Sequence, residues 1–268
     1  SPRNKSFAAA ITIVGNLNPQ TDSIPEVIIP NTYSTSHIIL YFFRGDGANA
    51  AQPDTMSLSG GMFYDVTPAI GDVDGDGIPE LIYTAWDRYI RVMRNYTPGA
   101  NPPMEDWLKS DKQTRTGGFR PVLADMNGDG TPEIVAGDEV FIVDLTHPAG
   151  PLLRKVLDAN SYYGSDPSAY TPRLNCVATA DILTPADCGG DPDCEGLEIA
   201  AGPVIYSVDI DTTDGDGFEI KIQRNLNMQT QPDQYSDGYT AVADMNLDGI
   251  PDVVVSGVLN PGGANAKM

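Results

Sequence analysis

Acidic and amide side chains recur along the chain in a loop pattern whose spacing could bind a metal ion. In its clearest copy, side chains that end in oxygen stand at positions 1, 3, 5 and 9, with glycine at position 6. Unpaired carboxylates this close repel one another, so the pattern needs a cation among them. A flexible cage of about six to eight oxygens suits Ca²⁺, whereas Mg²⁺ needs a tighter octahedron. The pattern therefore predicts calcium-binding loops.

Three copies of the pattern form complete candidate sites. In each copy we assign four side chains and the backbone carbonyl at position 7 as ligands. The first set comprises Asp72, Asp74, Asp76, the Ile78 carbonyl and Glu80. The second set comprises Asp125, Asn127, Asp129, the Thr131 carbonyl and Glu133. The third set comprises Asp244, Asn246, Asp248, the Ile250 carbonyl and Asp252.

Two further copies depart from the pattern, and the residues alone leave open whether they bind calcium. One has asparagine at positions 1 and 3, and its two formal charges indicate either weak binding or a loop held by hydrogen bonds alone. Its candidate ligands are Asn16, Asn18, Asp22, the Ile24 carbonyl and Glu26. The other spreads its acids over an insertion, and its candidates are Asp181, Asp193 and Glu198. We expect three Ca²⁺ ions in the chain, and at most five.

Two alternatives compete with a calcium loop of this kind. An EF-hand needs a bidentate acid at position 12 of its loop and a helix on either side. Position 12 is instead Tyr83, Ala136 or Val255, and the residues after each loop are apolar and β-branched, as in strands. A solvated acidic turn without metal is disfavoured because three full copies occur in register at a regular period.

The loops mark an internal repeat, which points to the elements that position them. Position 1 of the five loops is Asn16, Asp72, Asp125, Asp181 and Asp244. Successive copies of this position are 53 to 63 residues apart. Each unit begins with a strand of small residues, followed by the acidic loop, a β-branched run and two more strands. Four strands in about 55 residues are typical of a β-propeller blade, whereas solenoid repeats are shorter, at about 20–45 residues.

The predicted fold is therefore all-β, a β-propeller of four-stranded antiparallel blades that forms a single domain over residues 1–268. About four and a half to five blades are expected, at residues 7–62, 63–117, 118–174, 175–238 and, in part, 239–268. We expect further sequence to complete the ring. The absence of an initiator Met and of a signal peptide favours a trimmed product.

The motif Asp-x-Asp/Asn-x-Asp-Gly-x-Pro-Glu/Asp resembles the loop of FG-GAP/VCBS repeats, whose blades form the integrin α-subunit propeller and parts of many bacterial surface proteins. The resemblance covers essentially the whole chain. It implies a loop that joins the first two strands of a blade and binds Ca²⁺ at the positions named above. The chain lacks the Phe-Gly and Gly-Ala-Pro signatures and keeps only an aromatic residue such as Phe63, Phe119 or Tyr239 before the loop. It therefore resembles the bacterial branch more than an integrin.

Composition narrows the partners and the compartment. The net charge of −21 argues against a nucleic acid or an anionic lipid surface, because both need a basic face. The apolar run 38–43 is far too short for a transmembrane segment, which takes about 18–20 residues. Calcium sites of extracellular type have a Kd of about 10⁻⁴–10⁻³ M and need millimolar calcium. We therefore expect a secreted or cell-surface protein.

Other reactive residues fit this compartment without indicating catalysis. A disulfide between Cys188 and Cys194 would close the insertion in the fourth loop, with Cys176 as an alternative partner for Cys188. His37 and His147 are expected to have packing or surface roles, and no Gly-x-Ser-x-Gly or His-Glu-x-x-His motif occurs. The tripeptide at residues 44–46, Arg-Gly-Asp, is one that integrins recognise, and we interpret it as a coincidence.

The sequence thus favours a calcium-binding propeller that acts as a non-catalytic binding or adhesion module. A protein or glycan ligand would bind the variable connections 95–118 and 158–174. The expected contact residues there are Trp107, Tyr162, Tyr163 and Tyr170. The alternatives are a propeller domain of a polysaccharide-degrading enzyme and a self-associating structural subunit of an extracellular filament or sheath.

Overall fold

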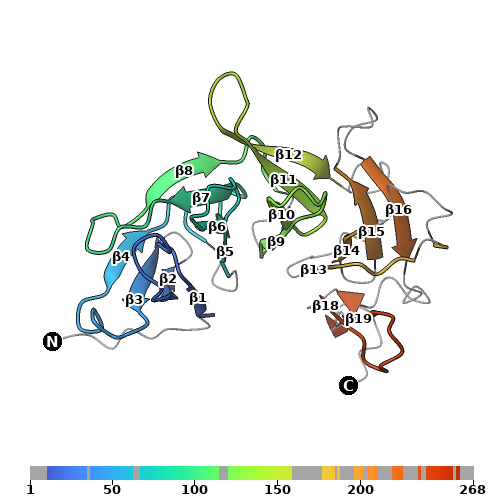
Figure 1. Ribbon diagram of the computed structural model, residues 1–268, viewed down its shortest axis with the longest axis horizontal. Coiled ribbons are helices and arrows are strands. Elements are labelled where there is room, and N and C mark those ends of the chain that lie inside the picture. The colour runs from blue at the N-terminus through green and yellow to red at the C-terminus, as the bar shows by residue number, and fades with distance from the viewer. Residues whose placement is uncertain are drawn as a thin grey trace. The chain divides into compact units, whose positions relative to one another are not determined.

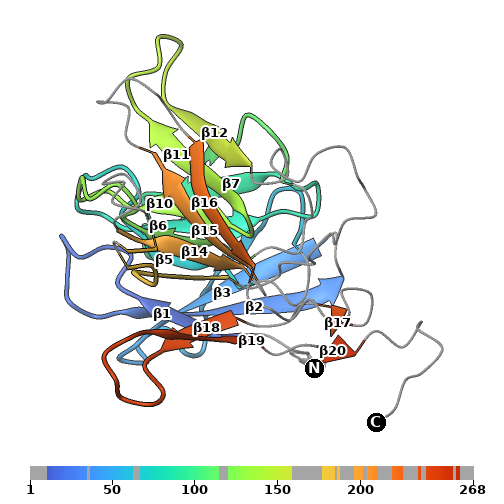
Figure 2. The same cartoon turned by 90° about the vertical axis from the view of Figure 1, so that its right-hand side faces the viewer.

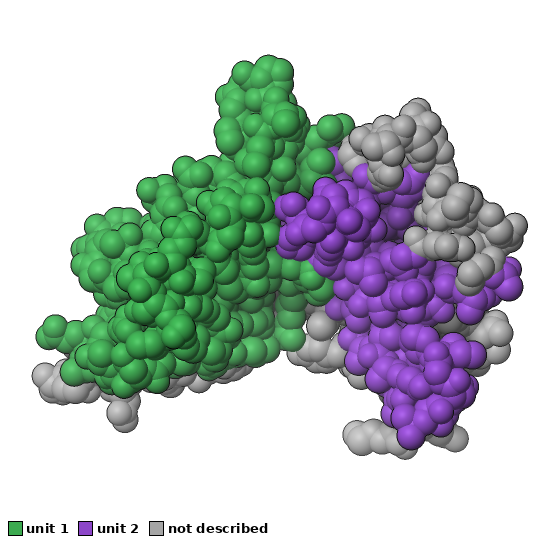
Figure 3. Space-filling model, in the orientation of Figure 1, with its two compact units in different colours: residues 1–123, 142–154 green, residues 124–141, 155–268 purple. Residues whose placement is uncertain are grey.

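The computed structural model describes most of the chain, and every structural statement below refers to the described residues. They are 11–34, 37–62, 67–114, 120–158, 177–184, 186–187, 196–201, 204–210, 219–225, 235–236, 240–255 and 258–259. The chain divides into two compact units, Ser1–Leu123 with Ile142–Arg154 and Ala124–Phe141 with Lys155–Met268 (Figure 3). Each unit is considered by itself.

Strands and turns make up the described residues, and four sheets of four strands each follow the chain in order (Figure 1). The first sheet contains β1 Ile13–Gly15, β2 Glu26–Ser34, β3 His37–Arg44 and β4 Asp54–Ser57. The second contains β5 Ala69–Gly71, β6 Glu80–Thr84, β7 Ile90–Arg94 and β8 Glu105–Lys109. The third contains β9 Val122–Ala124, β10 Glu133–Ala136, β11 Glu139–Asp144 and β12 Leu152–Asp158. The fourth contains β13 Ala178–Ala180, β14 Glu198–Ala201, β15 Val204–Asp209 and β16 Glu219–Asn225.

Two shorter sheets follow near the C-terminal end. Strands β18 Thr240–Ala243 and β19 Asp252–Val255 pair antiparallel and repeat the first two strands of a full sheet. Strands β17 Tyr235–Ser236 and β20 Val258–Leu259 pair with each other. The predicted all-β class and four-stranded antiparallel unit are confirmed. The ring, its blade boundaries and its blade total stay predictions.

The first strand of each sheet is short and ends in glycine or alanine, and at Gly15 and Gly71 the next sheet approaches closely. A Cβ on Gly15 would come 2.9 Å from Ile70 Cδ1 on β5, and one on Gly71 would meet Leu123 Cδ1 on β9. In the second unit, β18 contacts β13 and β14, the first two strands of the preceding sheet (β14 and β18 are labelled in Figure 2). The predicted first strands therefore contact one another in succession within each unit.

The second strands β6, β10 and β14 each begin with the position-9 glutamate and continue with mostly apolar residues. All five residues of β6 and all four of β10 and β14 are buried. In the first unit, the first two sheets share one hydrophobic cluster, in which the rings of Phe42 and Tyr96 stack with centroids 5.3 Å apart. In the second unit, Leu183 and Ile205 pack with Val253 of β19. The described strands and turns include no helix with the length and apolar character needed to cross a membrane.

Candidate metal centre in the acidic loops

Each acidic loop is a hairpin that joins the first strand of a sheet to the second. In the second sheet, β5 ends at Gly71 and β6 begins at Glu80, and these two residues are directly paired across the ladder. The same holds for Ala243 and Asp252 in the last sheet. Antiparallel pairing therefore brings the two ends of the loop together and places positions 1 and 9 side by side.

One hydrogen bond recurs in all five copies of the loop. A carboxylate oxygen at position 9 accepts the backbone N–H of the residue that follows position 1. The donors and acceptors are Leu17 to Glu26 at 3.0 Å, Val73 to Glu80 at 3.0 Å, Met126 to Glu133 at 2.8 Å, Ile182 to Glu198 at 2.6 Å, and Met245 to Asp252 at 3.0 Å. Each bond uses Oε2 of a glutamate or Oδ2 of Asp252. We call this bond the position-9 clamp.

Side chains at positions 1 and 5 fold the rest of the loop around themselves. Asp72 Oδ2 accepts the N–H of Gly77 at 2.8 Å, and Asp76 Oδ1 accepts that of Ile78 at 2.7 Å. The same bonds occur in the 125–133 and 244–252 loops. Gly77 has φ of +84°, in the left-handed region that glycine tolerates best. The glycine at position 6 is therefore a requirement of the turn.

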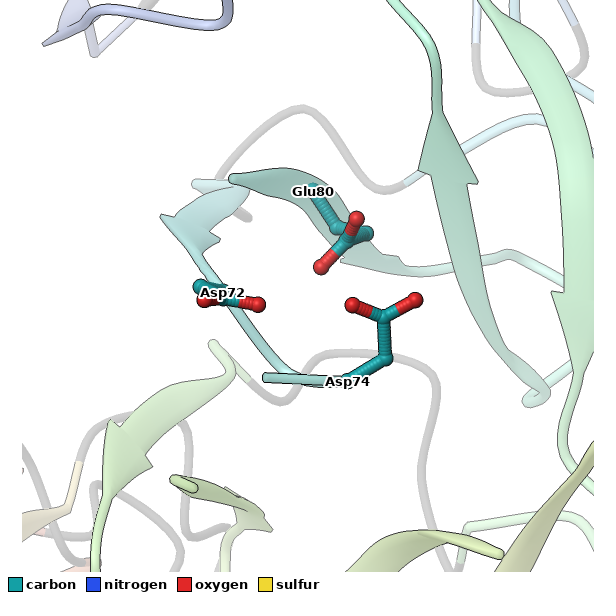
Figure 4. A group of neighbouring side chains, drawn as sticks. All are labelled: Asp72, Asp74 and Glu80. Atoms are coloured by element: carbon teal, nitrogen blue, oxygen red, sulfur yellow. The ribbon is translucent and has the colours of Figure 1, made fainter. Parts of the chain in front are cut away.

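The acids of the first complete set converge (Figure 4). Oxygens of Asp72, Asp74 and Glu80 lie within 4.8 Å of one another, and the three side chains point into a common space between the ends of β5 and β6. The Glu80 side chain is buried, with the residue 1% exposed. Its burial, with lesser contributions from Asp74 and Asp76, raises its pKa to about 8, and burial also raises the pKa of Asp74. A cation placed among these groups would remove the cost of ionising them.

The second set has an unsatisfied oxygen in the same place. Asp125 Oδ1 is buried and has no hydrogen-bond donor among the described residues. Burial also raises the pKa of Glu133 to about 7. A buried carboxylate oxygen without a donor costs free energy unless a cation or water contacts it. The residues present in this set therefore fit a hard cation that prefers oxygen ligands.

The second and third sets differ from the first at position 3. Asn127 and Asn246 replace Asp74, and each donates its side-chain N–H to the position-5 acid, at 3.3 Å to Asp129 Oδ2 and 3.0 Å to Asp248 Oδ2. Among the described acids, only the first set forms a convergent group. The third set is also the most exposed, with Met245 at 67% and Leu247 at 87% exposure, whereas Val73 is buried.

The two altered copies are arranged differently from the complete sets. In the first, Asp22 Oδ2 accepts a hydrogen bond from Arg44 Nη1 at 2.9 Å. The backbone N–H of Ile24 and the guanidinium of Arg44 both lower the pKa of Asp22. In the other, Glu198 Oε2 accepts the N–H groups of Ile182 and Leu183. Asp181 is exposed.

Several predicted residues lie outside the part of the chain that the structure describes. They are Asp193, the cysteines Cys176, Cys188 and Cys194, the aromatic residues Tyr162, Tyr163 and Tyr170, and the loop-preceding Phe63, Phe119 and Tyr239. Trp107 is described and is half-buried, with Arg94 Cζ 4.5 Å from its ring centroid. Part of this predicted contact surface is therefore covered by a guanidinium group.

A pocket of about 670 Å³ lies within the first unit and was not predicted as a cavity. It is lined by strands β3, β4 and β8 and by the start of the connection 95–118 that was predicted to bind ligands. Its apolar lining is Ile39, Met56, Pro102 and Met104, and its polar lining is Thr55, Ser57, Ser59, Asn101, Glu105 and Asp106. The combination of apolar patches with hydroxyl, amide and carboxylate groups suits a ligand with both hydroxyl groups and apolar faces.

Comparisons with known proteins address the repeat. A family model described as FG-GAP-like repeat matches residues 72–136, a span that contains the first and second complete sets. No curated protein matches the chain. Among solved structures, the chain is similar to the crystal structure of the V. cholerae biofilm matrix protein Bap1, with 19% sequence identity and a TM-score of 0.49. The alignment covers 92% of this chain and 34% of that one, so the chain spans about a third of its length.

Proposed function

We propose that this chain, which carries an FG-GAP-like repeat at residues 72–136, is an extracellular, non-catalytic binding module whose acidic loops hold Ca²⁺. The convergent group of Asp72, Asp74 and Glu80 carries the proposal. Burial raises the pKa of Glu80 to about 8, and a divalent cation held by this group would keep Glu80 ionised at neutral pH. The sets 125–133 and 244–252 repeat the same loop bonds and are the second and third proposed sites.

The ion would fasten the two strands that the loop joins. Glu80 already binds the Val73 N–H through Oε2, which leaves Oε1 for the ion together with Asp72 and Asp74. When bound, Ca²⁺ supplies the positive charge that the acids lack. Stabilisation of the folded form reaches about 2.7 kcal/mol per site at a hundredfold excess over Kd. Sites of this type fill at millimolar calcium, which favours the outside of the cell.

The pocket beside β4 and β8 is the proposed ligand site of the module. It lies where the connection 95–118 was expected to bind a protein or a glycan, and its lining offers both polar and apolar contacts. A glycan is the ligand class that we favour, because sugars present hydroxyl edges and apolar ring faces to such a surface.

Calcium binding is tested by titration calorimetry and by thermal unfolding in calcium and in EDTA. We expect Asp72→Asn with Asp74→Asn to remove one bound ion and to reduce the calcium-dependent rise in Tm. The matched control is Asp106→Asn, which removes an acid from β8 and should leave the number of ions unchanged. An unfolding curve that EDTA leaves unmoved would overturn the proposal.

Ligand binding is tested on a glycan array with the calcium-loaded protein. Ser57→Trp would fill the pocket and should abolish binding at the array positions that the unaltered protein occupies, whereas Thr146→Trp, in a turn of a different sheet, should not. Turnover of any bound glycan would favour the enzyme alternative. Assembly into filaments without glycan binding would favour the structural subunit.

A further inference from the structure

The first acidic loop contains a positive charge that comes from the protein itself. Arg44, the last residue of β3, places Nη1 at 2.9 Å from Asp22 Oδ2 and Nη2 at 3.3 Å from Asp46 Oδ2. Its side chain is 21% exposed and that of Asp22 is 33% exposed, so the pair is partly shielded from water. An ion pair in this setting is stronger than one on an open surface.

Asp22 corresponds to position 5 of the complete loops. Its Oδ1 accepts the N–H of Ile24 at 2.8 Å, as Asp76 Oδ1 accepts that of Ile78 at 2.7 Å. Both acids also stand four residues before the residue that makes the position-9 clamp. The guanidinium of Arg44 therefore occupies the carboxylate oxygen that corresponds to a proposed calcium ligand in the other loops.

The two asparagines among the candidate ligands of this loop are also engaged within the protein. Asn16 Oδ1 accepts the N–H of Asn18 at 3.0 Å, and Asn16 Nδ2 donates to the Asp22 carbonyl at 2.7 Å. Asn18 Oδ1 accepts the Thr21 hydroxyl at 2.8 Å. Besides the position-9 clamp of Glu26, this loop closes through two neutral amides and one arginine, whereas the 72–80 loop keeps three acids facing one another.

The next sheet provides a comparison for the role of Arg44. Arg44 is paired with Glu26 across the β2–β3 ladder. In the second sheet Leu81 is paired with Met93, so one residue further along the ladder Arg94 stands opposite Glu80. Arg94 is directed to β8, where Nε lies 3.5 Å from Glu105 Oε2 and Cζ lies above the Trp107 ring. The same residue type at the same register therefore enters the loop site in one sheet and stays away from it in the other.

We propose that the Arg44 guanidinium takes the place of the metal ion in the first repeat, so that its loop is held without calcium. This inference rests on the proposed function, because it contrasts this loop with loops that bind Ca²⁺. It also accounts for the Arg-Gly-Asp tripeptide. Arg44 and Asp46 bind each other, and Gly45 donates its N–H to the Pro25 carbonyl at 2.8 Å, so the tripeptide fastens the loop to β3.

Hydrogen exchange measured by mass spectrometry on the full chain, in EDTA and in millimolar calcium, tests the inference loop by loop. We expect calcium to slow exchange of residues 72–80 about tenfold or more and to leave residues 16–26 within about twofold. Arg44→Gln should speed exchange of residues 16–26 in both conditions, and calcium should not restore it. Arg94→Gln, the matched control at the same register, should leave residues 16–26 unchanged.

The outcomes separate this inference from the proposed function. Slowing of residues 16–26 by calcium to the same extent as residues 72–80 would overturn the inference alone, as would unchanged exchange in Arg44→Gln. If calcium slowed no loop, the proposed function would fail, and the inference would fail with it because no ion would exist for Arg44 to replace. If Arg44→Gln does not fold, Arg44→Lys provides the same measurement, with an intermediate rate expected for residues 16–26.

Discussion

At the scale of single residues, the position-9 acid has two roles that can be separated. One oxygen of Glu80 shapes the loop through the Val73 N–H, and the other is proposed to bind the ion. Glu80→Gln keeps an oxygen that can accept the N–H and removes the charge. We therefore expect this variant to equal or exceed the unaltered protein in Tm at pH 9 in EDTA, and to fall below it in calcium.

The measurement is thermal unfolding under the two conditions, with Glu105→Gln as a charge-matched control. Glu105 lies on β8 and is exposed, so its loss should shift Tm by little in either condition. A variant Glu80→Gln that lost as much stability in EDTA as in calcium would show that the charge itself shapes the loop.

The buried acids also make stability depend on pH. Burial raises the pKa of Glu80 to about 8 and that of Glu133 to about 7, from an ordinary 4.5. Between pH 4.5 and these raised pKa values, the two glutamates keep their protons in the folded, metal-free protein but lose them in the unfolded chain. The free energy of unfolding therefore falls as pH rises. We expect Tm in EDTA to be lower at pH 8 than at pH 6, and calcium affinity to rise over the same interval. A Tm in EDTA that rose from pH 6 to pH 8 would contradict these assignments.

At the scale of elements, the backbone conformation of the loop places Leu247 in a strained, left-handed conformation. Position 4 of the loop has positive φ in all three complete copies, at +75° in Gly75, +73° in Gly128 and +62° in Leu247. A leucine in the left-handed conformation costs about 1–2 kcal/mol. Glycine would remove this strain, but its greater conformational freedom in the unfolded chain costs about 0.5–1 kcal/mol in return. Leu247→Gly is therefore expected to stabilise the protein by about 0.5–1 kcal/mol.

Urea unfolding measures this effect, with Leu247→Ala as the control. Alanine removes the exposed apolar side chain but keeps the Cβ that causes the strain, so it should give less than half of the glycine effect. Equal gains from both substitutions would assign the effect to the apolar exposure of Leu247 instead.

The repeat made the elements predictable from sequence, whereas contacts between them were not. Alternating acids, the glycine at position 6 and the β-branched run are local signals, and they predicted the hairpin from β5 to β6 and its counterparts. The role of Arg44 depends on the register of β3 against β2 and on a side chain 22 residues from Asp22. No local pattern contains that information. The group of three acids at Asp72, Asp74 and Glu80 was predictable in part, because the later sets carry asparagine at position 3, which the sequence already shows.

At the scale of the whole molecule, net charge should dominate the behaviour of the metal-free protein. The chain carries a formal charge of −21, and like charges repel more strongly in the compact form than in the unfolded one. Salt screens such repulsion over about 10 Å at 0.1 M. We expect sodium chloride to raise Tm in EDTA and to raise it less in saturating calcium, where three bound ions would reduce the formal charge from −21 to −15. Equal salt effects in the two conditions would indicate that bound ions leave the repulsion unchanged.

The position-9 clamp has a consequence for how quickly the protein would respond to its surroundings. Because the hairpins of the three complete sets are already closed by this bond to their own backbone, an arriving ion meets a receptor that is shaped in advance. Uptake and release then require no rebuilding of the strands on either side. The occupancy of the loops would follow the calcium concentration of the medium almost without delay, while the sheets that carry them stay in place.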